Sequence, residues 1–315
     1  MTNPKSAFPG RSQGTRQNPK YHGLFVGLVT LDLIYLADNP PSNNQKIVAS
    51  DYTVAAGGPA TNAAVTFSYL NRRDAITLVS TVMGVVGSHP MTQLIKGDLI
   101  KYGVVIADLN DSTTQPPPVS SIIVTQTTGE RAVISINAVK TQASREAITP
   151  EILENIDIVL IDGHQMSVGS VIAQMAKAKN IPVVIDGGSW KPGFEQILPF
   201  VDYAICSANF SPPGCQSESE VLAYLKDIHI PHIAITHGDK PIQYLTGSTY
   251  GYLDVPNVQA VDTLGAGDVF HGAFCHYILQ ENFTTALSLS AQIASLSCQY
   301  FGTRRWMDNK EIKIK

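Results

Sequence analysis

Short apolar runs recur along most of this chain, and the segment that follows each run is long enough to form a helix. Apolar runs bounded by polar residues are typical of buried strands. Because parallel strands need a long crossover between them, this alternation predicts an α/β fold with helices on both faces of a parallel sheet. The predicted strands are HGLFVGLVTLD, which ends at Asp32, and then AITLVSTV, NIDIVLID, IPVVID, VDYAIC and HIAITH.

The composition narrows the classes of partner. The 315 residues carry a formal charge of −4, and only 15% of them are charged, without a long run of one sign. We therefore expect no nucleic-acid partner and no polybasic contact with a membrane, but a small neutral or anionic substrate. No apolar run reaches the roughly 18 residues that span a bilayer. With 44% hydrophobic residues, the chain can bury one large α/β core or two smaller ones.

The cysteines and the first residues bear on the compartment. The four cysteines show no CxxC spacing and are too sparse for a disulfide scaffold, so we interpret them as reduced thiols of a cytosolic protein. Residues 1–20 contain four basic and no acidic side chains and lack the apolar core of a secretory signal. We expect this tail to be disordered.

Two segments interrupt the alternation. Residues 38–56 are polar and contain proline, and residues 116–137 form two β-rich runs around a Thr-Thr-Gly-Glu turn. Strands without a crossover helix do not easily join a parallel sheet. We predict that they form a small separate sheet, which is either a lid over a site or an oligomer contact.

A glycine turn precedes a helix that the pattern predicts toward the C-terminal end of the chain. Gly265, Ala266 and Gly267 carry little side-chain bulk, so the backbone can turn tightly and its N–H groups can approach a ligand. Apolar residues at helical spacing begin at Val269. The N-terminus of a helix favours anions such as phosphate, so this turn is a candidate anion site.

Asp268 lies in the first turn of that predicted helix and has two interpretations. Its carboxylate could accept the proton of a substrate hydroxyl while a phosphoryl group is transferred to the oxygen. Alternatively, it could simply cap the helix. The turn alone does not decide between a catalytic and a structural aspartate.

Three separated motifs together resemble the ribokinase-like, or PfkB, family of carbohydrate kinases. They are Asp32 after an apolar run, GGPATN at 57–62 and DTLGAGD at 262–268. GLVTLD and VDTLGAGD look most like ketohexokinases, while GPATNAAV and GAGDVFHGAF are also similar to bacterial sugar-phosphate and sulfosugar kinases. The resemblance extends over about residues 23–302. The chain contains no GxxxxGK[ST] motif of P-loop enzymes.

The resemblance implies a three-layer α/β/α ribokinase-like domain over residues 21–315, with a lid formed by the two β-rich segments. Some members of the family dimerise through this lid. The implied reaction is ATP-dependent phosphorylation of a primary hydroxyl of a ribose-like or ketohexose-like sugar. ATP would bring Mg²⁺, and K⁺ would lie near Asp262 and Thr263 where a member uses it.

The resemblance also implies roles for individual residues. Asp268 would be the base, and the backbone of residues 265–267 (Gly265, Ala266 and Gly267) would form the anion hole. The sugar hydroxyls would be held by Asp32, Gly58 and Asn62. Thr236 and Gly238, in ITHGDKP, match a Thr-x-Gly stretch near the nucleotide.

The chain departs from the family pattern at two places. Pro59 occupies a position where ketohexokinases have an asparagine that touches the sugar and ribokinase has a lysine, which leaves the sugar open. Where many members carry Asn-x-x-Glu for the water shell of the metal, this chain has Asn209-Phe-Ser-Pro212. Asp186 is the remaining candidate for holding magnesium through water.

Other functions stay open at this point. A nucleoside kinase and a sugar-phosphate or sulfosugar kinase are alternatives within the family, and a sensor that kept the fold without catalysis is one outside it. A Rossmann-type oxidoreductase is disfavoured, since no GxGxxG follows the first strand. His271 and His276 are five residues apart, would not share a helix face, and are interpreted as packing residues.

Overall fold

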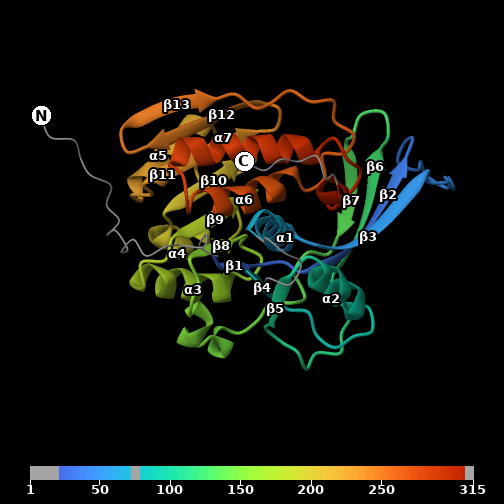
Figure 1. Cartoon of the computed structure of the whole chain (residues 1–315), viewed down its shortest axis with the longest axis horizontal. Coiled ribbons are helices and arrows are strands. Elements are labelled where there is room, and N and C mark those ends of the chain that lie inside the picture. Colours follow the sequence, from blue (N-terminus) through green and yellow to red (C-terminus); the bar gives the residue numbers. More distant parts are fainter. Residues whose placement is uncertain (1–20, 72–78, 309–315) are drawn as a thin grey trace, which may run out of the picture.

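The computed structural model describes residues 21–71 and 79–308, which form two sheets and the helices around them (Figure 1). The strands are β1 (Gly23–Val26), β2 (Thr30–Ala37), β3 (Asp51–Gly57), β4 (Ser80–Gly84), β5 (Val104–Asp108), β6 (Val119–Thr125), β7 (Arg131–Ser135), β8 (Ile158–Ile161), β9 (Val183–Gly187), β10 (Tyr203–Ser207), β11 (His232–His237), β12 (Lys240–Thr246) and β13 (Thr249–Leu253). The α-helices are α1 (Pro59–Asn71), α2 (Thr92–Lys101), α3 (Met166–Ala178), α4 (Phe194–Ile197), α5 (Glu218–Asp227), α6 (Ala266–Tyr277) and α7 (Phe283–Ser297). Short 3₁₀ helices span Arg145–Ala147, Pro150–Leu153, Leu198–Phe200 and Arg305–Asp308.

The large sheet has nine strands in the order β13-β12-β11-β10-β9-β8-β1-β4-β5, and the strands from β11 to β5 run parallel. This confirms the expected α/β class with a mostly parallel sheet. One expectation was wrong. The segment after HIAITH forms the antiparallel hairpin of β12 and β13 instead of a helix, because His237 and Lys240 pair across a tight turn at Gly238, whose φ is +68°.

Two separate apolar cores lie on the two faces of the large sheet, which makes the domain three layers thick. Residues that alternate along a strand point to opposite faces. Phe25 of β1 therefore packs with α1, α6 and α7, while its neighbours Leu24 and Val26 pack with α3, α4 and α5. In Figure 1, α3 lies below β8 and β9, whereas α6 and α7 lie above them.

The small sheet has four strands in the order β3-β2-β6-β7 and projects from one end of the large sheet (Figure 1). Its strands differ from the predicted segments. Residues 38–50 contain no strand, and the sheet also includes β2. The first apolar run was wrongly interpreted as one strand ending at Asp32: β1 ends at Val26, and Asp32 is the third residue of β2. The run looks continuous because both strands are buried.

Two other predictions concern residues that lie wholly or partly outside the described part of the chain. The tail of residues 1–20 lies outside it, and so does the beginning of AITLVSTV, whose later residues enter β4. The described residues contain no helix that is both long and apolar enough to cross a bilayer.

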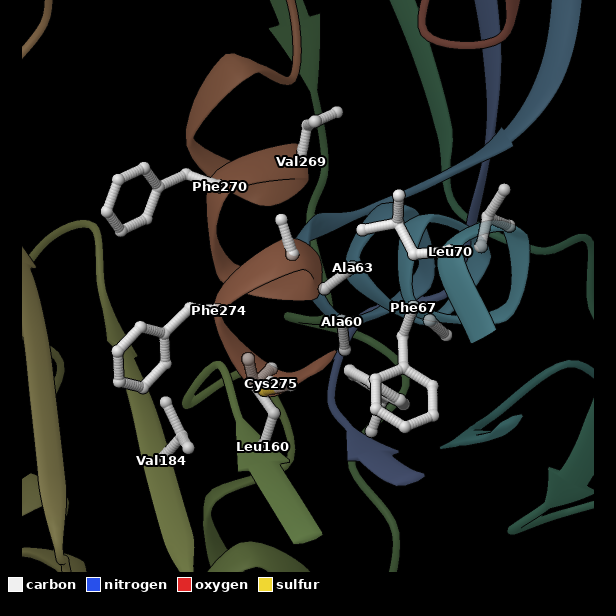
Figure 2. Packing of buried hydrophobic residues seen from close by; sticks show 14 of the residues in the cluster. Ala60, Ala63, Phe67, Leu70, Leu160, Val184, Val269, Phe270, Phe274 and Cys275 are labelled. Atoms are coloured by element: carbon white, nitrogen blue, oxygen red, sulfur yellow. The ribbon is translucent and has the colours of Figure 1, made fainter. Parts of the chain in front are cut away.

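Helices α1 and α6 cross at close range, and Gly272 permits this. A Cβ at Gly272 would lie 2.3 Å from the carbonyl oxygen of Ala63 and 2.7 Å from the Cβ of Thr66. Figure 2 shows Ala63 of α1 pointing toward α6, while Phe274 of α6 points away from α1. This contact brings together the N-terminal ends of two helices that are far apart in sequence.

Candidate active site

Backbone geometry leaves the N-terminus of α6 free to receive an anion. Gly265 precedes the helix with a φ of +72°, a left-handed conformation that favours glycine. No side chain caps the first turn. A Cβ at Gly267 would meet no atom within 4 Å, and Gly267 is exposed. The Ala266 N–H donates to the Thr263 carbonyl oxygen at 3.3 Å. The exposed Gly267 N–H beside open space offers a site for negative charge.

Asp268 is held at this turn by a residue of α1. The Asn62 side-chain nitrogen donates a hydrogen bond of 2.8 Å to Oδ2 of Asp268. Asp268 occupies the third helical position rather than the cap, which is Gly265, so the interpretation as a helix cap has no support. Burial and the nearby Asp186 raise the pKa of Asp268 to about 7, although Asn62, His271 and Arg131 act in the opposite direction. A carboxyl group with this pKa can accept a proton near neutral pH.

His271 was expected to be only a packing residue, but its ring also contacts polar groups of three elements. Its Nδ1 lies 2.7 Å from the carbonyl oxygen of Gly267, its Nε2 lies 3.1 Å from that of Ile205, and Nδ1 is 3.6 Å from Asp186. The ring therefore ties the first turn of α6 to β10 and faces Asp186 of β9. His276, by contrast, packs against Phe67 as expected, and burial lowers its pKa to about 4.

Asp162, which directly follows β8, anchors the loops around the site. Its carboxylate accepts N–H bonds from Leu28 at 2.9 Å, Ala60 at 3.1 Å and His164 at 2.8 Å. Burial would raise the pKa of Asp162, but His164 and these donors outweigh it and lower the pKa to about 2. Asp162 thus fixes the start of α1, from which Asn62 extends.

Asp32 of β2 is buried and incompletely bonded. Only 5% of the residue is exposed, and Oδ1 has no hydrogen-bond partner. A Cβ at Gly57 would lie 1.9 Å from Oδ2, so only glycine fits beside this carboxylate. Burial raises the pKa of Asp32 to about 6, against a hydrogen bond from Ser120 and the charge of Arg304. A buried carboxylate oxygen without a donor is suited to a ligand hydroxyl.

The small sheet reaches the glycine turn through the connection between β6 and β7. The backbone N–H and the hydroxyl of Thr263 both donate to the carbonyl oxygen of Gly129, each at 3.1 Å. Arg131, the first residue of β7, extends toward Thr263 with contacts of 3.3 Å and 3.4 Å. The small sheet is therefore in contact with the segment that leads into the candidate anion site.

Comparison with known proteins decides the family. The model of the pfkB family carbohydrate kinases matches residues 23–310. The chain belongs to this family. It is therefore a kinase, and its family phosphorylates carbohydrates with ATP.

Ribokinases are among the relatives of this pfkB kinase. The ribokinase of Lactococcus lactis is 23% identical over 301 residues, which cover 92% of this chain and 95% of the relative. The ribokinase of Bacillus subtilis is also 23% identical, over 298 residues, with coverage of 90% and 95%.

Solved structures share the fold. The ribokinase of Giardia lamblia aligns with a TM-score of 0.73 at 18% identity, covering 91% of this chain and 99% of that protein. The ribokinase of Arabidopsis thaliana, solved with ribose and ATP, aligns with a TM-score of 0.70 at 21% identity, covering 90% and 94%.

Thr236 and Gly238 of the pfkB kinase lie near the end of β11. The Thr236 hydroxyl donates to the carbonyl oxygen of Cys206 at 3.3 Å, and Gly238 has open space where a Cβ would point. In a parallel sheet, the carboxyl ends of the strands share one edge. β11 is two strands from β9, so this pair lies on the same edge as Asp186.

Three residues of the site were missed by the sequence interpretation. Asp162 ends a predicted strand, and the rule that functional carboxylates follow strands could have identified it. Arg304 and Asp98 carried no signal, because one is the first of two adjacent arginines in a C-terminal segment and the other is an ordinary acidic residue of α2. The three are joined to the predicted site only by the folding of the chain.

Proposed function

We propose that this kinase transfers the γ-phosphoryl group of ATP to a primary hydroxyl of a ribose-like or ketohexose-like sugar, with Asp268 as the base. The observation that carries this proposal is a carboxyl group with a pKa of about 7 at an uncapped helix N-terminus, beside the open backbone of Gly267. The carboxylate takes the proton while the N–H groups of residues 265–267 stabilise charge on the phosphoryl group.

The sugar is held by Asp32, Gly58 and Asn62. Asp32 supports this assignment most strongly, since its buried Oδ1 is left without a donor within the chain. Two neighbouring hydroxyls could donate to one carboxylate. Asn62 already bonds to Asp268 and Arg304 and has one amide hydrogen left for a substrate. Gly58 has a φ of +101°, and a Cβ there would collide with the carbonyl oxygen of Leu28.

The nucleotide lies along the edge that contains Thr236 and Gly238. We propose that Mg²⁺ accompanies the ATP and neutralises charge on its phosphates. Asp186 fits this role through water, because its carboxylate is close enough to raise the pKa of Asp268 and a cation between them would relieve that repulsion. K⁺ would lie near Asp262, whose two carboxylate oxygens accept N–H bonds from Leu264 and Gly302.

The small sheet acts as a lid and as a dimer contact in this proposal. Ile34, Ile122 and Val124 of its inner face pack on Phe301. Its outer face presents Tyr35, Tyr52, Val54 and Ile134, which are 39%, 66%, 39% and 78% exposed. An exposed apolar sheet face favours burial against a second copy of the chain. Light scattering should give a dimer, and Tyr52→Glu should give monomers; a wild-type monomer would contradict the dimer.

A substrate panel tests the reaction itself. Sugars, sugar phosphates and nucleosides are incubated with ATP and Mg²⁺, and ADP release is measured. We expect the highest kcat/KM for a free pentose or ketohexose. A nucleoside or a sugar phosphate as the best substrate would instead support that alternative, and sugar binding in calorimetry without ADP release would support a sensor.

A further inference from the structure

Arg304 is a buried arginine whose guanidinium is almost completely occupied. It is 9% exposed, and its NH1 donates to Oδ1 of Asn62 at 2.9 Å and to the hydroxyl of Thr303 at 3.1 Å. NH2 donates to the carbonyl oxygen of Ala56 at 2.7 Å, and both NH2 and Nε lie 3.3 Å from Oδ2 of Asp98. The group is therefore fixed from several sides by protein atoms.

Arginine has only donors, and this decides how the Asn62 carboxamide is turned. Its oxygen must face Arg304, because a nitrogen there would oppose a second donor. The amide nitrogen then faces Asp268, to which it donates at 2.8 Å. Without Arg304, only Asp268 would select the orientation of the Asn62 carboxamide, and a protonated Asp268 could donate to the amide oxygen instead.

The same guanidinium is anchored to the small sheet. Ala56 lies at the end of β3, an edge strand, just before the turn into α1. Its N–H donates to Asp98 at 3.0 Å and its carbonyl oxygen accepts from Arg304, so the ion pair occupies both backbone groups of this edge residue. Arg304 thus contacts the strand next to Asp32 and the residue that holds Asp268.

We propose that Arg304 is a positioning residue for the base of the reaction: it sets the orientation of the Asn62 carboxamide, and Asn62 in turn holds the Asp268 carboxylate. This inference rests on the proposed function for the role of Asp268. Arg304 itself contacts neither the Asp268 carboxylate nor the phosphoryl site. It acts through the side chain of Asn62, to which both Arg304 and Asp268 are hydrogen-bonded.

Carboxyl NMR of protein labelled with ¹³C-aspartate tests the inference without any substrate. The Asp268 signal is assigned as the one that is lost in Asp268→Asn. Its titration midpoint depends on the groups that face Asp268, which are Asp186, Asn62, His271 and Arg131. Asn62→Leu removes the bond to Asp268 and should raise the midpoint by about one pH unit. Arg304→Met releases the Asn62 carboxamide and should raise the midpoint in the same direction by up to the same amount. The double variant should shift no further than Asn62→Leu alone.

Arg305→Met is the matched control, because Arg305 is exposed and its described interactions, an ion pair with Asp51 and a contact with the Phe301 ring, involve neither Asn62 nor Asp268. Its Asp268 midpoint should equal that of the wild type. If Arg304→Met melts below the assay temperature, Arg304→Lys replaces it and should still shift the midpoint, since an ammonium cannot form the same fork. A folded Arg304 variant with an unchanged midpoint, or shifts that add in the double variant, would overturn the proposal.

Turnover with D-ribose as the probe separates this inference from the proposed function. If the wild type phosphorylates ribose, Arg304→Met should lower kcat about tenfold and leave the ATP affinity unchanged. If ribose is not a substrate, the NMR titration still decides whether Arg304 positions Asp268, because it needs no substrate.

Discussion

At the scale of single residues, the site combines carboxylates with opposite electrostatic surroundings. Asp162 is surrounded by donors, which lower its pKa. Burial raises the pKa values of Asp32 and Asp268. A carboxylate that is well bonded by the chain supports the fold, and one that is left short of donors is available to a ligand.

Asp32→Ala should remove the hydrogen bonds that hold the sugar. Bonds to a charged group contribute about 1.5–3 kcal/mol each, so losing two should reduce kcat/KM for the sugar roughly 10²- to 10⁴-fold. KM and kcat should both suffer, because the same bonds orient the attacking hydroxyl. Separate sugar and ATP kinetics check this; an equal loss for both ligands would indicate damage to the fold instead.

Asp162→Asn should destabilise the protein in a pH-dependent way. The pKa of Asp162 is about 2 in the folded protein and its ordinary value is 3.8, so the stabilisation is complete above pH 3.8 and is lost as the pH falls through about 2. Urea unfolding at pH 7 should show a loss of about 2 kcal/mol. The gap between variant and wild type should narrow below pH 4, and a gap that stays constant would count against the carboxylate charge as its cause.

At the scale of elements, the crossing of α1 and α6 aligns Asn62 with Asp268. Gly272→Ala places a methyl group 2.3 Å from the Ala63 carbonyl, so the helices must separate. We expect a loss of about 1–3 kcal/mol in unfolding free energy and a lower kcat. The matched control is Gly97→Ala in α2, where a Cβ meets nothing within 4 Å. It should stabilise by about 0.5–1 kcal/mol, and equal melting of the two variants would refute the role of the close crossing.

The elements also show what could be predicted from the sequence. Periodicity correctly predicted the β8, β9, β10 and β11 regions and the helix α6, because the strands are mostly buried on both faces and the apolar residues of α6 recur at helical spacing. It failed at Asp32, because the buried strands β1 and β2 are joined by apolar residues and look like one strand. It also failed at β12, because antiparallel pairing depends on a partner strand that the local pattern does not reveal. Arg304 could not be predicted, because its function depends on contacts across more than 200 residues, as in its bond to Asn62 with a separation of 242.

At the scale of the whole molecule, the family membership and the fold agree with the arrangement of the site. Asp186 lies in the large sheet, Asn62 and Asp268 lie in α1 and α6, and Asp32 lies in the small sheet. If the proposed function holds, catalysis needs contributions from both sheets.

This arrangement predicts the pH dependence of the reaction. The base must be ionised in the free enzyme, so kcat/KM should fall as the pH drops below the Asp268 pKa of about 7. Initial rates with the best sugar of the panel, measured between pH 5 and 9 (a range of about two units around that pKa), check this. A rate that is flat down to pH 5 would mean that a group with a lower pKa accepts the proton.

The most direct test of the central claim is Asp268→Asn, measured for turnover and stability in the same preparation. The neutral amide can still accept the Asn62 bond but cannot take a proton, so kcat should fall at least about 10²-fold while ATP affinity is retained. A raised pKa means that the ionised carboxylate costs stability at high pH, by up to about 4 kcal/mol, and this cost disappears below pH 3.8. The variant should therefore be more stable than the wild type at pH 8 and equally stable near pH 4. A folded Asp268→Asn enzyme with near-normal turnover would contradict the account.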